Sequence, residues 1–349
     1  MQPYHVGIVG YGWAAQAHLP AINAGSRARV TAVCSSRPLD SAELSARHGC
    51  PLKVYRDYAA LLADPEIQVV SLCGYHKEHA AQAIAAARAG KHLIVEKPLA
   101  LSLADLRAAE QAVRAAGVRF CLCFELRFSA QFRETRALLE RGLLGTLHYA
   151  EVDYYHGIGP WYREFEWCTT VGECGSALLE AGCHALDALL LCLPGEVEEV
   201  FSYGTRSAHP TFARYEYPST TATVLKFRDG AVGKCAAVID CWQPYYFHTH
   251  LVGSEGSVLD NRFHSNRLHG DDRHSWKELP FKPVDSGDVA DHPYQTQFEA
   301  FFAALDRGED MPLTSLKEAV RTHEVVFAAD LSWKEHRPVK LAEIRSTGS

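Results

Sequence analysis

The sequence of 349 residues lacks several features that define specialised classes of protein. No apolar run approaches the ~20 residues that a membrane-spanning helix needs. The first residues also lack the charged and apolar regions of a signal peptide. The net charge of −7 leaves no basic surplus to neutralise phosphates, which argues against a nucleic-acid binder. We therefore expect a globular protein without a membrane or nucleic-acid partner, built as two domains or one large one.

The cysteines also lack a recognisable pattern. The 11 of them form no CxxC pair and no zinc-finger spacing, and their odd number leaves at least one unpaired within the chain. Several stand in apolar surroundings, namely Cys34, Cys73, Cys121, Cys123 and Cys192. This usage is typical of buried, reduced thiols and predicts a cytoplasmic protein without a structural metal site.

Strand-like and helix-like segments alternate over the first 120 residues. The expected strands are 5–9, 29–34, 69–73, 93–95 and 118–124, and the expected helices are 13–24, 41–48, 58–63, 78–89 and 103–116. Such alternation predicts an α/β fold with a doubly wound parallel sheet, the Rossmann arrangement.

The second half of the chain has a different pattern. Helices are expected at 130–141, 177–192, 294–305 and 315–334, and strands at 147–155, 198–203, 222–227, 232–239, 248–252 and 257–261. Arg228-Asp229-Gly230 is typical of a hairpin turn. We predict a first domain over 1–124 and an α+β domain over 125–349 with a mainly antiparallel sheet and helices on one face. A helix at the end of the chain could pack back on the first domain.

A glycine loop joins the first expected strand to the first helix. Gly10-Tyr-Gly12-Trp13-Ala-Ala15 is GxGxxA, in which Gly10 permits a tight turn, Gly12 permits close approach of a pyrophosphate, and Ala15 permits close helix–strand contact. The helix N-terminus then offers N–H groups and partial positive charge. This context predicts a dinucleotide site.

The end of the second strand indicates which dinucleotide is bound. An acidic residue there would hold the ribose 2′-hydroxyl of NAD, but the chain has Ser35, Ser36 and Arg37, and the next acid is Asp40. The two hydroxyls and the guanidinium suit a 2′-phosphate, which favours NADP over NAD. The alternative is a solvated Arg37 and an enzyme that accepts both cofactors.

A polar stripe runs along an otherwise apolar helix. Glu180, His184 and Asp187 have the i, i+4, i+7 spacing of one helix face, and Gly182 would leave space for a ligand beside them. A histidine with carboxylate neighbours can transfer a proton near neutral pH. The alternatives are a structural His–Asp pair, or zinc held by Glu180 and His184 with His156 or Glu173.

The stretch HLIVEKPLALS, residues 92–102, ends a buried strand in Glu96-Lys97-Pro98. Charge at the carboxyl end of a parallel strand is compatible with a ligand cleft, and Pro98 biases Lys97 towards extended backbone. The alternative is a strand that ends at the surface with a solvated lysine.

Together these motifs resemble the Gfo/Idh/MocA family of oxidoreductases, which includes glucose–fructose oxidoreductase and inositol dehydrogenase. The resemblance rests on GYGWAA at 10–15, EKPLALS at 96–102, EAGCHALD at 180–187 and the run HAAQAIAAARAGKHLIVEKP. It implies a Rossmann domain followed by an α/β domain with an open sheet that commonly pairs between subunits. A homodimer or homotetramer is therefore expected, with the strands 222–227 and 232–239 as candidate contacts.

The resemblance also implies residue roles. Lys97 matches the catalytic-site lysine of EKP, and His184 and Asp187 match the histidine and aspartate of GxHxxD, while Glu180 stands where related members usually have Asp. The family commonly has Thr-Pro-Asn and then His after the fourth strand, whereas this chain has Gly74-Tyr75-His76 and then His79. The implied catalytic set is Lys97, His184, Asp187 and Glu180, and cofactor contacts are expected from Cys73, His76, His79, Glu96 and Lys97.

A loop of aromatic residues completes the expected substrate site. Trp161, Tyr162 and Arg163 lie in GIGPWYREFEWC, where aromatic faces suit pyranose rings and the guanidinium suits hydroxyls or a carboxylate. The alternative is packing at a subunit interface. With Lys97, Glu180 and His184, these residues would bind a small carbohydrate or cyclitol.

The expected activity is hydride transfer between a nicotinamide and a hydroxyl or keto carbon of a sugar, sugar derivative or cyclitol. Two alternatives share the fold. One is a redox-neutral, sugar-modifying or glycoside-cleaving enzyme with tightly bound cofactor, and the other is a non-catalytic nucleotide sensor.

Overall fold

The computed structural model describes residues 2–268, 272, 274–281 and 292–346. The chain divides into two compact units, which are residues 1–125 with 293–320 and residues 126–292 with 321–349. The chain therefore leaves the first unit near the boundary expected at 124/125 and later returns to it. The returning segment carries α10 (Tyr294–Asp306), which is not the last helix of the chain.

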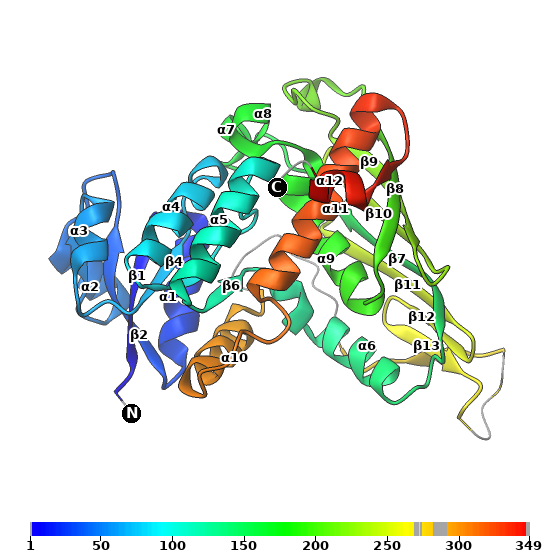
Figure 1. Cartoon of the computed structure of the whole chain (residues 1–349), viewed down its shortest axis with the longest axis horizontal. Helices are drawn as coiled ribbons and strands as arrows, with labels where there is room; N and C mark the ends of the chain where they lie inside the picture. Colours follow the sequence, from blue (N-terminus) through cyan, green and yellow to red (C-terminus); the bar gives the residue numbers. More distant parts are fainter. Residues whose placement is uncertain (1, 269–271, 273, 282–291, 347–349) are drawn as a thin grey trace. The chain divides into compact units, whose positions relative to one another are not determined.

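The first unit is a parallel α/β sheet, as predicted. Its elements are β1 (Tyr4–Val9), α1 (Trp13–Ala24), β2 (Ala28–Cys34), α2 (Ser41–His48), β3 (Lys53–Tyr55), α3 (Tyr58–Ala63), β4 (Val69–Leu72), α4 (His76–Arg88), β5 (His92–Val95), α5 (Leu103–Ala116) and β6 (Phe120–Leu122), with α10 added. The strand order is β3-β2-β1-β4-β5-β6. Helices α4 and α5 pack side by side, and α1 packs against α10 (Figure 1).

Local sequence explains where these helices begin and end. Asp40, Asp57 and Ser102 accept hydrogen bonds from the first-turn N–H groups of α2, α3 and α5. Gly117 adopts φ +65° and closes α5, as expected for a glycine at this position. Helix α1 is different, because it begins at Gly12 without a side-chain cap and without an acidic residue in its first turn.

The second unit is a nine-stranded mixed sheet with helices on one face. Its elements are α6 (Ala130–Glu140), β7 (Leu147–Tyr155), α7 (Phe165–Cys168), α8 (Val171–Cys174), η2 (Leu178–Gly182), α9 (Cys183–Cys192), β8 (Val197–Thr205), η3 (Pro210–Phe212), β9 (Thr220–Phe227), β10 (Val232–Val238), β11 (Tyr246–Gly253), β12 (Gly256–Leu259), β13 (Arg262–Ser265), β14 (Lys277–Glu278), α11 (Leu316–Glu335), β15 (Val339–Lys340) and α12 (Leu341–Ser346). Helix α11 starts in the first unit and continues in the second. A short 3-10 turn, η1 (Glu125–Phe128), spans the boundary between units.

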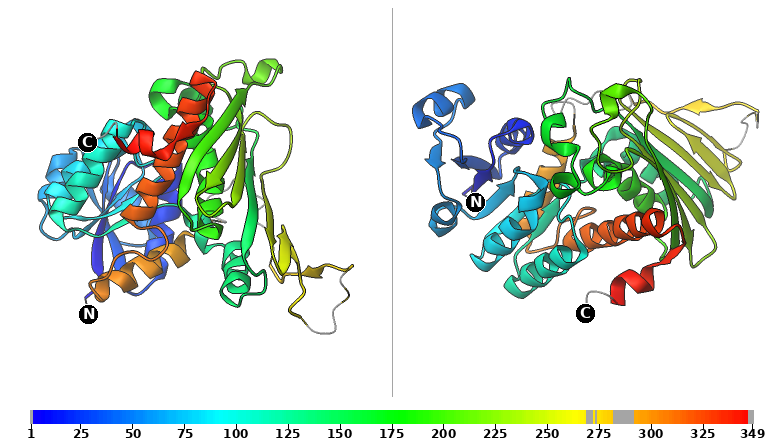
Figure 2. Two further views of the ribbon diagram at one scale, coloured as in Figure 1. Left: turned by 45° about the vertical axis from the view of Figure 1, so that its right-hand side comes forward. Right: turned by 90° about the horizontal axis from the view of Figure 1, so that it is seen from above.

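The sheet order is β14-β13-β12-β11-β7-β10-β9-β8-β15, in which only the β7–β10 pair is parallel among the described strands. The predicted turn at Arg228-Asp229-Gly230 joins β9 to β10, with φ +92° at Gly230. Figure 2 shows α6, α9 and α11 on the same face of this sheet. Helix α9 packs on β7 and β10.

One apolar segment corrects the sequence analysis. Val171–Cys192 is long and apolar enough, by length and composition, to cross a membrane, although no such run was expected. Its most apolar window is 89% buried inside the protein, which is the pattern of a core helix. All 11 cysteines are free, as expected for reduced thiols.

Candidate functional site

The glycine loop of the first unit fits a dinucleotide. Gly10 has φ +87°, and a Cβ there would lie 2.7 Å from the carbonyl oxygen of Cys73, so only glycine fits. This contact joins the ends of β1 and β4, where the strand order reverses, and open α/β sheets bind ligands at that switch point. A Cβ at Gly12 would face open space, while Trp13 is half exposed and Ala15 is fully buried. The start of α1, which has no side-chain cap and no acidic residue in its first turn, suits a pyrophosphate.

The end of β2 holds the three residues predicted to distinguish NADP from NAD. Ser35 is buried, and its hydroxyl accepts a hydrogen bond from the backbone N–H of Arg37 (3.1 Å). The Arg37 guanidinium donates to the carbonyl oxygen of Tyr11, inside the glycine loop, and Ser36 is exposed. Asp40 accepts from the backbone N–H of Glu43 as the cap of α2 and is therefore already engaged.

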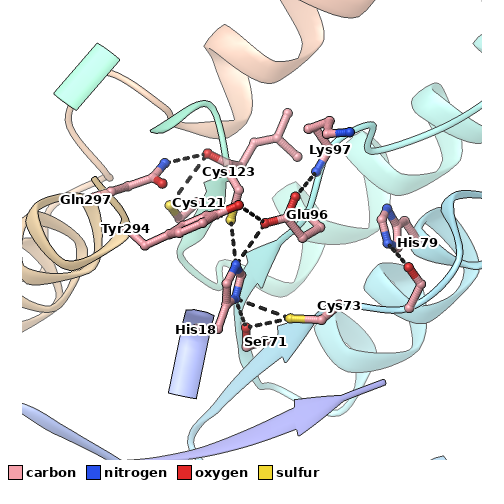
Figure 3. Close-up of polar contacts among 12 residues, drawn as sticks. His18, Ser71, Cys73, His79, Glu96, Lys97, Cys121, Cys123, Tyr294 and Gln297 are labelled. Atoms are coloured by element: carbon pink, nitrogen blue, oxygen red, sulfur yellow. Dashed lines mark hydrogen bonds and ion pairs between the residues drawn. The ribbon is translucent and has the colours of Figure 1, made fainter. Parts of the chain in front are cut away.

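Two histidines follow the end of β4. His76 begins α4, and burial together with the nearby Lys97 and His79 holds the pKa of His76 well below its usual value. His76 is therefore expected to carry a neutral imidazole at neutral pH. The His79 ring nitrogens lie 2.8 Å from the carbonyl oxygen of Pro98 and 3.2 Å from that of Gly74. His79 thus connects the end of β4 to the end of β5 (Figure 3).

Glu96 and Lys97 follow β5, at the same edge of the sheet as the glycine loop. The Glu96 side chain turns inward and is buried, with His18 and Tyr294 as hydrogen-bond partners (Figure 3). Its second carboxylate oxygen accepts from the backbone N–H of Lys97 (3.2 Å). The Glu96 carboxylate is therefore engaged within the unit, while Lys97 is only partly buried.

The second unit holds the three residues of the predicted polar stripe, all buried. Glu180 lies on the π-helical turn η2, and His184 and Asp187 lie on α9. The thiol of Cys174 donates to the Glu180 carboxylate (2.7 Å). A π turn places one extra residue in the helix and is common at functional sites.

Asp187 is held by a buried ion pair. Its carboxylate oxygens accept from the Arg127 guanidinium at 2.5 and 2.7 Å, and Thr322 Oγ1 donates to it at 2.8 Å. Arg127 and Asp187 are both at most 3% exposed. This bidentate geometry fixes the helix position from which Asp187 projects.

Gly182 has a packing role, which corrects the interpretation that it leaves space for a ligand. A Cβ at this position would lie 2.4 Å from the Cβ of Ala237 and 3.0 Å from Leu178 Cδ2. The helical turn η2 and strand β10 therefore approach each other too closely for a side chain at position 182.

Aromatic residues surround the start of this helix within the second unit. Burial is the main cause that raises the pKa of the Tyr154 hydroxyl well above its usual value, and Tyr245, Glu180 and Tyr162 add to this effect. His156 lies 2.7 Å from the Tyr154 hydroxyl, and its ring contacts those of Tyr162 and Tyr245 edge to face.

The predicted aromatic loop divides into two parts. Tyr162 packs on His156. Trp161 packs on Trp242, with ring centroids 5.2 Å apart, and the two tryptophans are 51% and 63% exposed. The Trp161 indole N–H donates to the carbonyl oxygen of Gly157. Arg163 is exposed.

Several residues in these arrangements were missed by the sequence analysis. They are His18, Arg127, Glu125 and Tyr294, all buried. His18, Glu125 and Arg127 have a detectable signal, because each places a titratable group among apolar residues, whereas Tyr294 stands in the polar stretch HPYQTQ and has no such signal. A buried group of this kind needs a partner, but the sequence does not show which partner it finds.

Known proteins share this arrangement over most of the chain. Residues 4–124 match the model of the oxidoreductase family with an NAD-binding Rossmann fold, and residues 132–259 match the GFO/IDH/MocA C-terminal domain. Myo-inositol 2-dehydrogenase of Thermotoga maritima is 24% identical over 339 residues, 97% of this chain and 99% of that protein. Scyllo-inositol 2-dehydrogenase (NAD(+)) of Bacillus subtilis is 27% identical, with 88% of each chain covered.

A solved structure agrees in fold. Scyllo-inositol dehydrogenase of Lactobacillus casei, determined with NAD(H) and scyllo-inositol, superposes with a TM-score of 0.80 at 19% identity, over 97% of this chain and 99% of that one. The parallel sheet, the loop at its switch point and the matched Rossmann model define a nicotinamide-dependent oxidoreductase. Because both matched domains come from one family, the chain belongs to the Gfo/Idh/MocA family, which confirms the resemblance.

Proposed function

We propose that this protein is an NAD(P)-dependent dehydrogenase or reductase acting on a CH–OH group of a sugar, sugar derivative or cyclitol. The observation that carries the proposal is Lys97, which follows β5 at the same sheet edge as the glycine loop, with its backbone held by Glu96. The inositol dehydrogenases among the relatives support a polyhydroxylated ring as substrate.

The proposed roles follow from the chemistry of each side chain. A bound nicotinamide supplies the hydride acceptor or donor. Lys97 hydrogen-bonds the substrate oxygen and stabilises the developing alkoxide, and His184 accepts the hydroxyl proton. The proposed role of Glu180 is to orient the substrate or relay the proton. The Arg127 ion pair supports an orienting role for Asp187. Trp161, Tyr162 and Arg163 are proposed substrate contacts.

We propose NADP as the preferred cofactor. The support is the Ser35-Ser36-Arg37 end of β2 together with Asp40, which is engaged in capping α2. Gly10, Gly12, Trp13 and Ala15 would hold the pyrophosphate, and Cys73, His76 and His79 would shape the nicotinamide side. Replacing Arg37 with Ala should lower the ratio of kcat/KM for NADP⁺ to that for NAD⁺.

We also propose a homodimer or homotetramer that uses the sheet face opposite the helices of the second unit. Tyr203, Val224 and Val232 are 63%, 47% and 39% exposed, which supports an apolar contact there. A cytoplasmic location is proposed from the free thiols of all 11 cysteines.

The test is a turnover screen of the purified protein with pyranoses, sugar acids and cyclitols, using NAD⁺ and NADP⁺ separately and following absorbance of the reduced cofactor. Signal with one substrate class supports the proposal. The variant Lys97→Ala should lose at least about 100-fold in kcat, with cofactor affinity changed little.

The matched control is Lys91→Met, at the opposite end of β5, which should retain turnover. Lys91 is buried and donates to the carbonyl oxygens of Asp64 and Ile67. Unchanged turnover in Lys97→Ala would contradict the mechanism. Silence across the panel with cofactor bound, combined with turnover of glycosides without net change in NAD(P)H, would instead support the redox-neutral alternative.

A further inference from the structure

A buried polar network lies inside the first unit, around His18 (Figure 3). His18 is fully buried, with Nδ1 2.8 Å from Ser71 Oγ and 3.3 Å from Cys73 Sγ. Its Nε2 lies 2.8 Å from Glu96 Oε1, which also accepts from the Tyr294 hydroxyl at 2.9 Å. No motif of the sequence analysis includes His18, and the proposed chemistry does not use it.

His18 and Glu96 form an ion pair. Burial alone would lower the pKa of His18, but Cys73 and the Glu96 carboxylate raise it to about 10. Burial alone would raise the pKa of Glu96, but His18, Lys97 and the Tyr294 hydroxyl lower it to about 2. At neutral pH the pair is therefore an imidazolium and a carboxylate, and removal of one partner leaves an uncompensated buried charge.

The pair joins the elements that carry the proposed chemistry. His18 lies on α1, the helix opened by the glycine loop, and Glu96 directly precedes Lys97. The Glu96 carboxylate bonds the imidazolium through Oε1 and the backbone N–H of Lys97 through Oε2. The position of the His18 ring is itself fixed by the rings of Tyr294 and Phe298, whose centroids lie 4.7 and 4.8 Å away.

We propose that His18 is a positioning residue for Lys97, acting through Glu96. The inference rests on the proposed function. The imidazolium fixes the Glu96 carboxylate beneath the Lys97 backbone and neutralises its charge. The positive charge of the imidazolium offsets that of the carboxylate, and so weakens the attraction that Glu96 exerts on the Lys97 ammonium. Among the described residues of this unit, His76, His79 and Glu125 interact with Lys97 as Glu96 does.

A metal ion is the competing interpretation of the same atoms. His18, Glu96 and Cys123 each offer a ligand atom within 4.8 Å of the others. However, the 2.8 Å between Nε2 and Oε1 is a hydrogen-bond distance. Two ligands placed tetrahedrally at ~2.0–2.1 Å from one zinc ion would lie more than 3 Å apart. The geometry therefore favours a shared proton.

Three variants test the proposal, namely His18→Gln, Glu96→Gln and the double variant. His18→Gln leaves the Glu96 carboxylate unneutralised beside Lys97. We expect kcat to fall about 10- to 100-fold, KM for the cofactor to change little, and the Lys97 titration to move upward by about one pH unit. Glu96→Gln leaves the imidazolium charge and should move the same titration downward. The double variant should return it close to the wild-type position.

The two single variants should shift the Lys97 titration in opposite directions, which a general loss of structure would not do. Lys91→Met, which removes buried hydrogen bonds at the other end of β5, should lower the melting temperature and leave the pH profile of kcat in place. The proposal is overturned if His18→Gln keeps wild-type kcat, if all three variants move the titration the same way, or if the purified protein contains one equivalent of a transition metal whose removal abolishes turnover.

The Lys97 titration can be followed without turnover. Reductive ¹³C-methylation of the lysines gives an NMR signal for each amine, and Lys97→Arg identifies the signal of Lys97. If the substrate screen fails but the variants move this signal in opposite directions, the proposed function fails and the His18 inference stands. If turnover is found but the signal does not move, the inference alone fails.

Discussion

The close contact between Gly182 and β10 leads to a measurable prediction. Gly182 has φ −63°, so alanine would meet no backbone strain there, and its better helix propensity would add up to ~1 kcal/mol of stability. The new Cβ would, however, lie 2.4 Å from Ala237 Cβ, and forced overpacking of a core costs ~1–3 kcal/mol. Because the contact is this short, we expect Gly182→Ala to destabilise the protein by ~1–2 kcal/mol.

The assay is urea unfolding of Gly182→Ala, Ala237→Gly and the double variant, followed by tryptophan fluorescence. Removing the Ala237 Cβ costs ~0.5–1 kcal/mol by itself but relieves the clash, so the double variant should be more stable than the sum of the single changes predicts, by ~1 kcal/mol or more. Additive effects, or a Gly182→Ala variant as stable as the wild type, would refute the packing argument. A raised KM at unchanged stability would instead favour space for a ligand.

Two further predictions concern buried charges. Burial and Glu96 raise the pKa of Glu125 to about 8, so the folded protein keeps a proton that the unfolded chain loses near its usual pKa of 4.5. The free energy of unfolding should therefore fall, by ~5 kcal/mol at most, as the pH rises from about 4.5 to 8, and Glu125→Gln should flatten this dependence in urea titrations. Arg127→Met leaves the Asp187 carboxylate buried without its guanidinium and should cost ~3–5 kcal/mol. Adding Asp187→Leu should recover part of that loss, and a double variant less stable than Arg127→Met would contradict the ion-pair argument.

The first unit could be predicted closely from the sequence because its signals are local. Helices at 13–24, 41–48, 58–63 and 103–116 begin and end where expected, and Asp40, Asp57, Ser102 and Gly117 supply the caps that define three of them. Strand β3 was missed because three residues are too short for a periodic pattern. The strand expected at 118–124 is only Phe120–Leu122, and directly after it the Phe124 N–H donates to the carbonyl oxygen of Leu122, which turns the chain away from the extended conformation.

The sequence identified several residues of the candidate site, but it did not show which residues they contact. The spacing of Glu180, His184 and Asp187 correctly placed them on one helical segment, yet the π turn and the different partners of Glu180 and Asp187 depend on tertiary contacts. Arg127 lies 60 residues before Asp187 and His18 lies 78 residues before Glu96. No local pattern specifies such pairs. The role of Gly182 was misjudged for the same reason, because Ala237 comes from a distant strand.

The return of the chain to the first unit determines when that unit can be completed during synthesis. Tyr294 of α10 bonds Glu96, and Gln297 donates to the carbonyl oxygen of Leu122. A ribosome-bound chain that ends shortly after β6 therefore has every strand of the parallel sheet but not the helix that covers α1. Because domains generally fold as units as they emerge, the nucleotide-binding half must wait, incompletely packed, until most of the second unit has been made. An amino-terminal fragment cut at residue 125 would expose the apolar face of α1 and form a poor independent domain.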